Sequence, residues 1–128
     1  MHPILRFAIC VAGAALVAGP AAADVLPLKH GRYVTSGTPC AKASRATTVP
    51  FDGRGFDLGD NGCRYTSRPA GGNRFEVASD CSSVGEGKSI DVYEVLSATE
   101  FRINGEARTR RWCAPAELPS WTQAVKIR

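Results

Sequence analysis

The sequence predicts a small all-β domain, an antiparallel barrel or sandwich of about seven to eight short strands stapled by two disulfides. Two observations predict the strands. No stretch shows the apolar spacing of three and four residues that an amphipathic helix needs, and short segments rich in β-branched and aromatic residues alternate with Gly, Pro, Asn and Asp. The third observation, which predicts the disulfides, is an even set of cysteines behind a leader typical of exported proteins.

Residues 1–23 are predicted to be a secretory signal peptide. A short cationic start, Met1–Arg6, precedes the apolar run Phe7–Gly19, and small residues follow up to Ala23. The apolar run has about 13 residues, fewer than the roughly 20 that a membrane-spanning helix needs. We therefore expect cleavage after Ala23, no stable membrane anchor, and a periplasmic or secreted protein with one domain over residues 24–128. An uncleaved leader that acts as an anchor is the alternative.

The candidate strands follow one another without a repeat or a long linker, so they form one domain. The dipeptides Asp52-Gly53 and Asn104-Gly105 accept positive φ angles and favour hairpin turns. The end of the chain differs, because Pro115 and Pro119 bound a segment that is expected to pack Trp121 back on the body, and residues 123–128 form an edge strand or fray. The candidate strands are residues 32–35, 46–49, 55–58, 64–66, 74–77, 90–95, 100–103 and 107–112.

Aromatic and branched residues dominate the interior of small β folds. Those placed inside the candidate strands or beside them are therefore expected to pack in the core rather than to contact a ligand. The expected core residues are Phe51, Phe56, Phe75, Val92, Phe101 and Ile103.

The cysteines that follow the leader are expected to form two disulfides. Their wide spacing, without any Cys-x-x-Cys pair, argues against a zinc site, so no metal is expected. Cys63 and Cys81 are equidistant from Gly72 in a turn-rich stretch, which favours a Cys63–Cys81 bridge and leaves Cys40 to join Cys113. The alternative joins Cys40 to Cys63 and Cys81 to Cys113, because the turn at Asp52-Gly53 lies near the middle of the first of those intervals.

The charge balance and the histidine count argue against two classes of function, nucleic-acid binding and enzymatic catalysis. Lysine and arginine number 16 against 12 acidic residues, a net charge of +4 that is too small and too dispersed to indicate a nucleic-acid binder. Only His30 follows the leader, and it is interpreted as an exposed residue before the first strand. Since general acid and base catalysis near neutral pH most often uses histidine, we expect no enzyme, no catalytic residue and no cofactor. Residues 57–62 carry closely spaced oxygen ligands but lack a calcium-loop pattern, and are interpreted as a turn.

The last hairpin offers the most informative surface. A three-residue loop, Asn104–Glu106, would set Phe101 opposite Thr109, whereas a two-residue loop would mix arginines with Phe101, which is unfavourable because a buried guanidinium needs a partner. The three-residue register points Arg111 the other way, to the rim or to an acid. It places a candidate anion-binding or partner-binding face on the opposite side, made of Arg102, Arg108, Arg110 and Trp112. The alternative is a solvated face that protects an edge from strand pairing.

Several short motifs in order give the chain a resemblance to a group of proteins. They are Gly31-Arg32-Tyr33, Gly37-Thr38-Pro39-Cys40, Phe51-Asp52-Gly53-Arg54-Gly55-Phe56, Cys63, Cys81 and Arg110-Arg111-Trp112-Cys113. With these motifs the chain resembles small exported two-disulfide β proteins of Gram-negative bacteria, which have no assigned activity. The resemblance implies compartment and compactness and no site residue. Periplasmic lysozyme inhibitors share the general format, but their sequence motif is not found here.

These observations predict a non-enzymatic binding or interaction module that contacts an envelope component or another protein. One alternative is a secreted inhibitor of a hydrolase such as a lysozyme; charge counts against it, since lysozymes of the c type are themselves basic and would not attract a basic partner. Others are a structural envelope component and an enzyme that uses carboxylates, although no carboxylate pair stands out.

Overall fold

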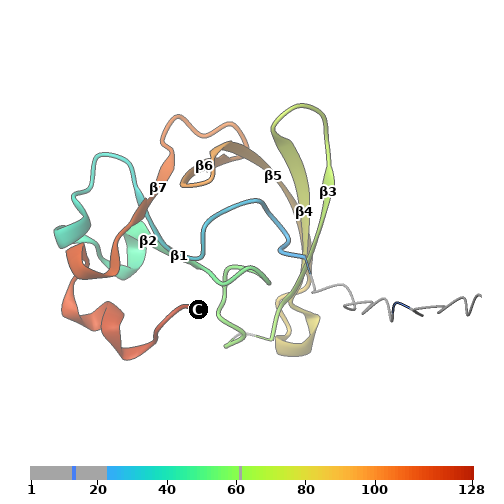
Figure 1. Cartoon of the computed structure of the whole chain (residues 1–128). Coiled ribbons are helices and arrows are strands. Elements are labelled where there is room, and N and C mark those ends of the chain that lie inside the picture. The colour runs from blue at the N-terminus through green and yellow to red at the C-terminus, as the bar shows by residue number, and fades with distance from the viewer. Residues whose placement is uncertain (1–12, 14–22, 61) are drawn as a thin grey trace, which may run out of the picture.

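The computed structural model describes Gly13 and residues 23–60 and 62–128 (Figure 1). The predicted signal peptide falls almost entirely outside the described residues. Among the described residues, no helix has the length and apolar character needed to cross a membrane.

The described residues form an all-β fold, as predicted. Seven strands make one antiparallel sheet that curls into a half-barrel, with the order β2-β1-β7-β6-β5-β4-β3 (Figure 1). Strands β2 and β3 are its two edges, and residues 52–63 connect them. The strands are β1 (Gly31–Thr35), β2 (Thr48–Phe51), β3 (Arg64–Pro69), β4 (Arg74–Asp80), β5 (Lys88–Ser97), β6 (Glu100–Ile103) and β7 (Arg110–Cys113).

Short 3-10 turns join or follow the strands. Their bounds are η1 (Cys40–Lys42), η2 (Arg45–Thr47), η3 (Ser82–Val84), η4 (Pro115–Glu117) and η5 (Ser120–Ala124).

The strand predicted at residues 55–58 is not formed. Leu58 has a φ angle of 55° and Gly59 one of 75°, and both angles are incompatible with an extended strand. The Asp57 carboxylate accepts hydrogen bonds from the main-chain nitrogens of Gly59 at 3.0 Å and Cys63 at 3.1 Å. The segment forms a turn, as interpreted, and Phe56 before it packs against the core.

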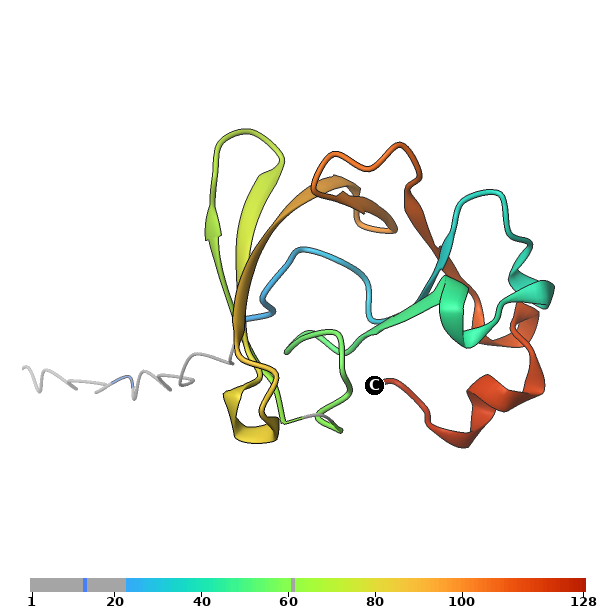
Figure 2. The same ribbon diagram turned by 180° about the vertical axis from the view of Figure 1, so that it is seen from behind.

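The main core lies on the concave side of the sheet. Residues 24–30, drawn in blue, cross this side in both views and bring Leu26 and Leu28 into the interior (Figures 1 and 2). There they pack with the fully buried Tyr33, Phe51 and Phe101. The interior of the half-barrel is therefore filled by side chains from the sheet and from the segment before it.

Most of the predicted core residues are confirmed. Phe51 and Phe101 are buried, and Phe56, Phe75 and Ile103 pack against them. The prediction that Val92 belongs to the core is wrong. Its side chain lies on the convex side and is 37% exposed, whereas its neighbour Tyr93 points inward and is 7% exposed. Successive side chains of a strand alternate between the two faces, so only one of these neighbours can enter the core.

The favoured disulfide pairing is confirmed. Cys63–Cys81 joins the two ends of the β3–β4 hairpin, whose register pairs Arg64 with Asp80 around the turn that contains Gly72. Cys40–Cys113 joins η1 to the end of β7 with a Cα–Cα distance of 5.9 Å.

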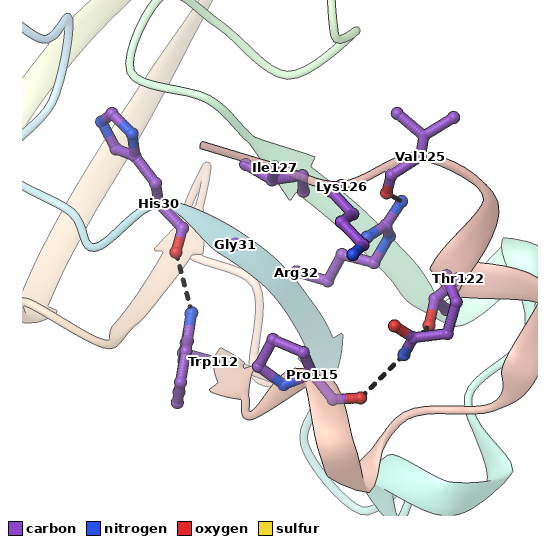
Figure 3. A pocket seen from close by; sticks show the side chains of 10 residues that line it. His30, Gly31, Arg32, Trp112, Pro115, Thr122, Val125, Lys126 and Ile127 are labelled. Carbon is purple, nitrogen blue, oxygen red and sulfur yellow. Dashed lines mark hydrogen bonds between the residues drawn. The ribbon is translucent and has the colours of Figure 1, made fainter.

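A second, smaller core covers the convex side of β1 and β7. It joins Val34 and Cys113 of the sheet to Ala43 and Leu118, which lie next to the 3-10 turns. Trp121 packs back on the body as predicted, and its indole Nε1 donates to the Ala43 carbonyl at 3.2 Å. The last residues, 125–128, form no strand, so the alternative of an edge strand is wrong; they cross the molecule beside the start of β1 (Figure 3).

Candidate functional site

The arginine face predicted on the last hairpin is divided between the two sides of the sheet. The structure pairs Phe101 with Arg110, not with Thr109, so the predicted three-residue loop and its register are wrong. Arg110 therefore lies on the concave side with Phe101, whereas Arg102 lies on the convex side, where its Nε donates to Glu94 at 2.8 Å. Arg108 is exposed in the connection before β7.

The cost of burying a guanidinium, which favoured the predicted register, is offset by an ion pair inside the connection. The Arg110 side chain is 19% exposed, and its Nη1 lies 3.2 Å from the Glu106 carboxylate. That contact lacks hydrogen-bond geometry. The glutamate therefore balances the positive charge of Arg110 but does not satisfy the Nη1 donor. The longer loop, residues 104–109, supplies the acid that a three-residue loop would have placed elsewhere.

Arg111 is half-buried and, among the described residues, forms no ion pair with an acid. Its Nη2 donates to the Thr38 carbonyl at 2.8 Å, and its Nη1 lies 3.2 Å from Cys40 Sγ. The guanidinium therefore holds the loop after β1 against the Cys40–Cys113 disulfide, and this arginine has a structural contact rather than a free binding surface.

Trp112, a member of the predicted face, lines a pocket. Its Nε1 donates to the His30 carbonyl at 3.0 Å, and the Lys29 ammonium lies 3.7 Å from the centre of its ring. Gly31, with a φ angle of +143°, makes this packing possible, because a Cβ atom there would overlap the indole nitrogen. The indole is thus fixed between the start of β1 and the segment before it.

The pocket lies where the start of β1, the end of β7 and the C-terminal tail (residues 125–128) meet (Figure 3). Its volume is about 340 Å³. Its lining includes two basic residues, Arg32 and Lys126, and His30, which is positively charged when protonated, but no acidic residue. We call it the tail pocket; its lining is His30, Gly31, Arg32, Trp112, Pro115, Thr122, Gln123, Val125, Lys126 and Ile127.

Arg32 is the central polar group of the tail pocket. Its side chain is half-buried, and this burial lowers the pKa of Arg32 from its ordinary value. Its Nη2 donates to the Val125 carbonyl at 2.8 Å. Within residues 23–60 and 62–128, no carboxylate lies within 4.0 Å of it. By contrast, the half-buried Arg102 and Arg110 each have a glutamate partner.

Arg32 also borders a second cavity of about 490 Å³ on the side of β2 and η5. That cavity contains Arg45, whose guanidinium lies 5.6 Å from the Trp121 ring, but it also contains Asp57 and Asp60. The second cavity is therefore of mixed charge. The tail pocket, by contrast, has no acidic residue in its lining.

His30 ties the start of the domain to its end. Its Nε2 lies 2.7 Å from an Asp24 carboxylate oxygen and its Nδ1 2.6 Å from the Arg128 main-chain oxygen. The bond to Arg128, followed by the bond to Asp24, raises the pKa of His30 above its ordinary value. His30 lies before β1, as interpreted, and its side chain is 34% exposed, but both of its ring nitrogens also have partners.

The tail pocket can hold an anionic group. A guanidinium presents several N–H donors in one plane, and only one donation by Arg32, to Val125, is made within the described residues. Lys126 adds a second cation from the tail itself. The lining combines these cations with the indole of Trp112, a composition suited to binding an anionic group.

Sequence reasoning missed Arg32, His30 and Lys126 as site residues. A signal for Arg32 was present, because a Cys40–Cys113 bridge places β1 near β7 and hence Arg32 near Trp112. No comparable signal placed Lys126, since the position of the tail depends on contacts far along the chain. When the chain was compared with models of protein families, with curated proteins and with solved structures, no match was found.

Proposed function

We propose that this protein is a non-enzymatic binding module of the periplasm or the extracellular space, and that its tail pocket holds an anionic group of an envelope component or of another protein. The observation that carries the proposal is Arg32, a half-buried guanidinium without a carboxylate partner among the described residues. A carboxylate, sulfate or phosphate group is the chemistry that would complete it.

The described surroundings of Arg32 leave most of its N–H donors without an acceptor. Taking a charged group partly out of water costs free energy unless a partner replaces the lost hydration. The Val125 carbonyl provides one acceptor for Arg32, but it brings no negative charge. An anion in the tail pocket would meet the remaining donors and would also lie near Lys126, so binding would recover part of the desolvation cost.

Two features support the proposed compartment. Two disulfides fit a chain that folds in an oxidising environment, and residues 1–23 have the composition of a secretory leader. Envelope polymers and proteins both offer carboxylate or phosphate groups to such a module.

Replacing Arg32 with glutamine is expected to weaken the binding of sulfate about tenfold to a hundredfold, the effect of losing a charged hydrogen-bond donor. Isothermal titration calorimetry with sodium sulfate at low ionic strength measures this. The matched control is Arg108→Gln, which removes the same charge from an exposed loop and is expected to leave the affinity within about twofold, since screened surface charges contribute little.

An equal loss in both variants would mean that sulfate responds to net charge alone and would remove the role of Arg32. Circular dichroism on each variant verifies that the fold is retained.

A further inference from the structure

The C-terminal tail is held over the tail pocket by two side chains that grip its main-chain oxygens. Arg32 donates to Val125 and His30 bonds to Arg128, and Val125, Lys126 and Ile127 between them form one wall of the pocket. No hydrogen bond between main-chain groups holds residues 125–128 within the described part of the chain. Among the described residues, these two side chains make the hydrogen bonds that hold this wall of the pocket.

The partners of His30 favour its protonated form. An ionised carboxylate and a main-chain oxygen can only accept hydrogen bonds, and a neutral imidazole has only one N–H to donate. Both contacts of His30, at 2.7 Å to Asp24 and at 2.6 Å to Arg128, can be hydrogen bonds together only when both ring nitrogens carry a proton. The two contacts together are those that an imidazolium ion would make.

We infer that His30 is a pH-dependent latch: when protonated it fastens the C-terminal tail over the tail pocket, and when it loses a proton it releases one of its two partners and loosens that wall. The part of this inference that concerns anion binding rests on the proposed function; the motion of the tail does not.

The charges around His30 come from each segment packed against it. Asp24 belongs to the segment before β1, and Asp52, which follows β2, adds a more distant negative charge. Arg54 lies beside Asp52 at 4.0 Å and moderates that charge. Lys126 and Arg128 of the tail and the neighbouring Lys29 are the cations of this region.

The balance among these groups favours the charged form of the ring. The bonds to Arg128 and Asp24 raise the pKa of His30, burial opposes them weakly, and the charges of Asp24 and Asp52 add to the increase. A raised pKa in the folded state means that the latch stabilises the fold fully at pH values below the ordinary imidazole pKa. That stabilisation is lost as the pH rises through the pKa of the folded protein.

Nuclear magnetic resonance tests the latch without any ligand. Between about pH 5.5 and about pH 8.5, which spans the ordinary imidazole pKa, the ring nitrogen shifts of His30 report protonation and the amide heteronuclear Overhauser effect of Ile127 reports tail motion. We expect the effect at Ile127 to fall with the same midpoint as the titration of His30. The full chain contains two histidines, and a His2→Gln variant assigns their signals.

Two variants isolate the mechanism. His30→Gln is expected to abolish the pH dependence at Ile127, and Asp24→Asn is expected to lower the pKa of His30 because it removes a negative partner. A tail whose motion is constant while His30 titrates, or a pH dependence that survives in His30→Gln, would overturn the latch.

Sulfate binding then tests whether His30 controls anion binding in the tail pocket. Sulfate suits this test because it keeps its charge over this pH range. We expect its affinity to fall about fivefold from the lower to the higher pH, the usual size of such a coupling, and to lose most of that dependence in His30→Gln. Equal affinity at both pH values would show that His30 does not control sulfate binding, while leaving the proposed function intact. Absence of sulfate binding at either pH would overturn the proposed function and the control of binding together, and the relaxation data alone would still decide the latch.

Discussion

Removing the Cys40–Cys113 disulfide is expected to lower the free energy of unfolding by about 4 kcal/mol, because the bridge closes a separation of 73 residues and so restricts the unfolded chain. The bridge also belongs to the second core, where Cys113 is buried beside Val34. Small domains are stable by only about 5 to 15 kcal/mol, so a loss of this size would leave the fold marginal. Urea unfolding of the Cys40→Ala, Cys113→Ala double variant measures it.

The Cys63–Cys81 bridge is the matched control. It closes a separation of 18 residues and joins two strands that already pair along the whole hairpin. Its replacement by two alanines is expected to cost about 3 kcal/mol, less than loss of the longer bridge. A cost below about 1 kcal/mol for the Cys40–Cys113 variant, which is the size of an ordinary substitution, would contradict the stabilising role of that bridge.

Phe101→Ala is expected to destabilise the protein by about 3 to 5 kcal/mol, the usual cost of removing a large aromatic side chain from a packed core. Phe101 is fully buried, and its ring centre lies 5.0 Å from that of Tyr33, 5.6 Å from that of Tyr93 and 5.9 Å from that of Phe56. The cavity left by alanine would remove contacts from the strands and from the turn that follows β2.

Val92→Ala is the control for this prediction. Val92 lies on the same sheet but on its convex side and is 37% exposed, so its truncation is expected to cost less than about 1 kcal/mol. Chemical denaturation with both variants at the same pH compares the two sides directly. A Val92 cost that equals or exceeds the Phe101 cost would mean that the assignment of the concave side as the core is wrong.

The sequence was sufficient for the fold class and favoured the observed disulfide pairing over its alternative, because the strand pattern and the Cys63–Cys81 hairpin are local features. The Cys63–Cys81 pairing followed from the symmetry of the two cysteines about a turn at Gly72, and the observed register has that symmetry. It was harder to predict which side chains of β5 face the core. Apolar residues lie on both sides of this strand, with Ile90 67% exposed and Tyr93 7% exposed, so alternation alone did not show which side is buried.

The candidate site required information that no local pattern carries. The register of β6 against β7 depends on how residues 104–109 fold, and in particular on the Glu106–Arg110 ion pair that makes the concave position of Arg110 tolerable. The tail pocket exists because Val125 and Arg128 reach Arg32 and His30 near the start of the domain. Contacts over such sequence distances follow from the whole fold.

Mapping sulfate onto the protein by nuclear magnetic resonance tests the binding claim most directly. At low ionic strength the account predicts that added sulfate shifts the Arg32 Nε–H and Trp112 indole Nε1–H signals most strongly, since both side chains line the tail pocket. Shifts centred on Arg102, Arg108 and Arg110, or spread evenly over the basic side chains, would contradict it.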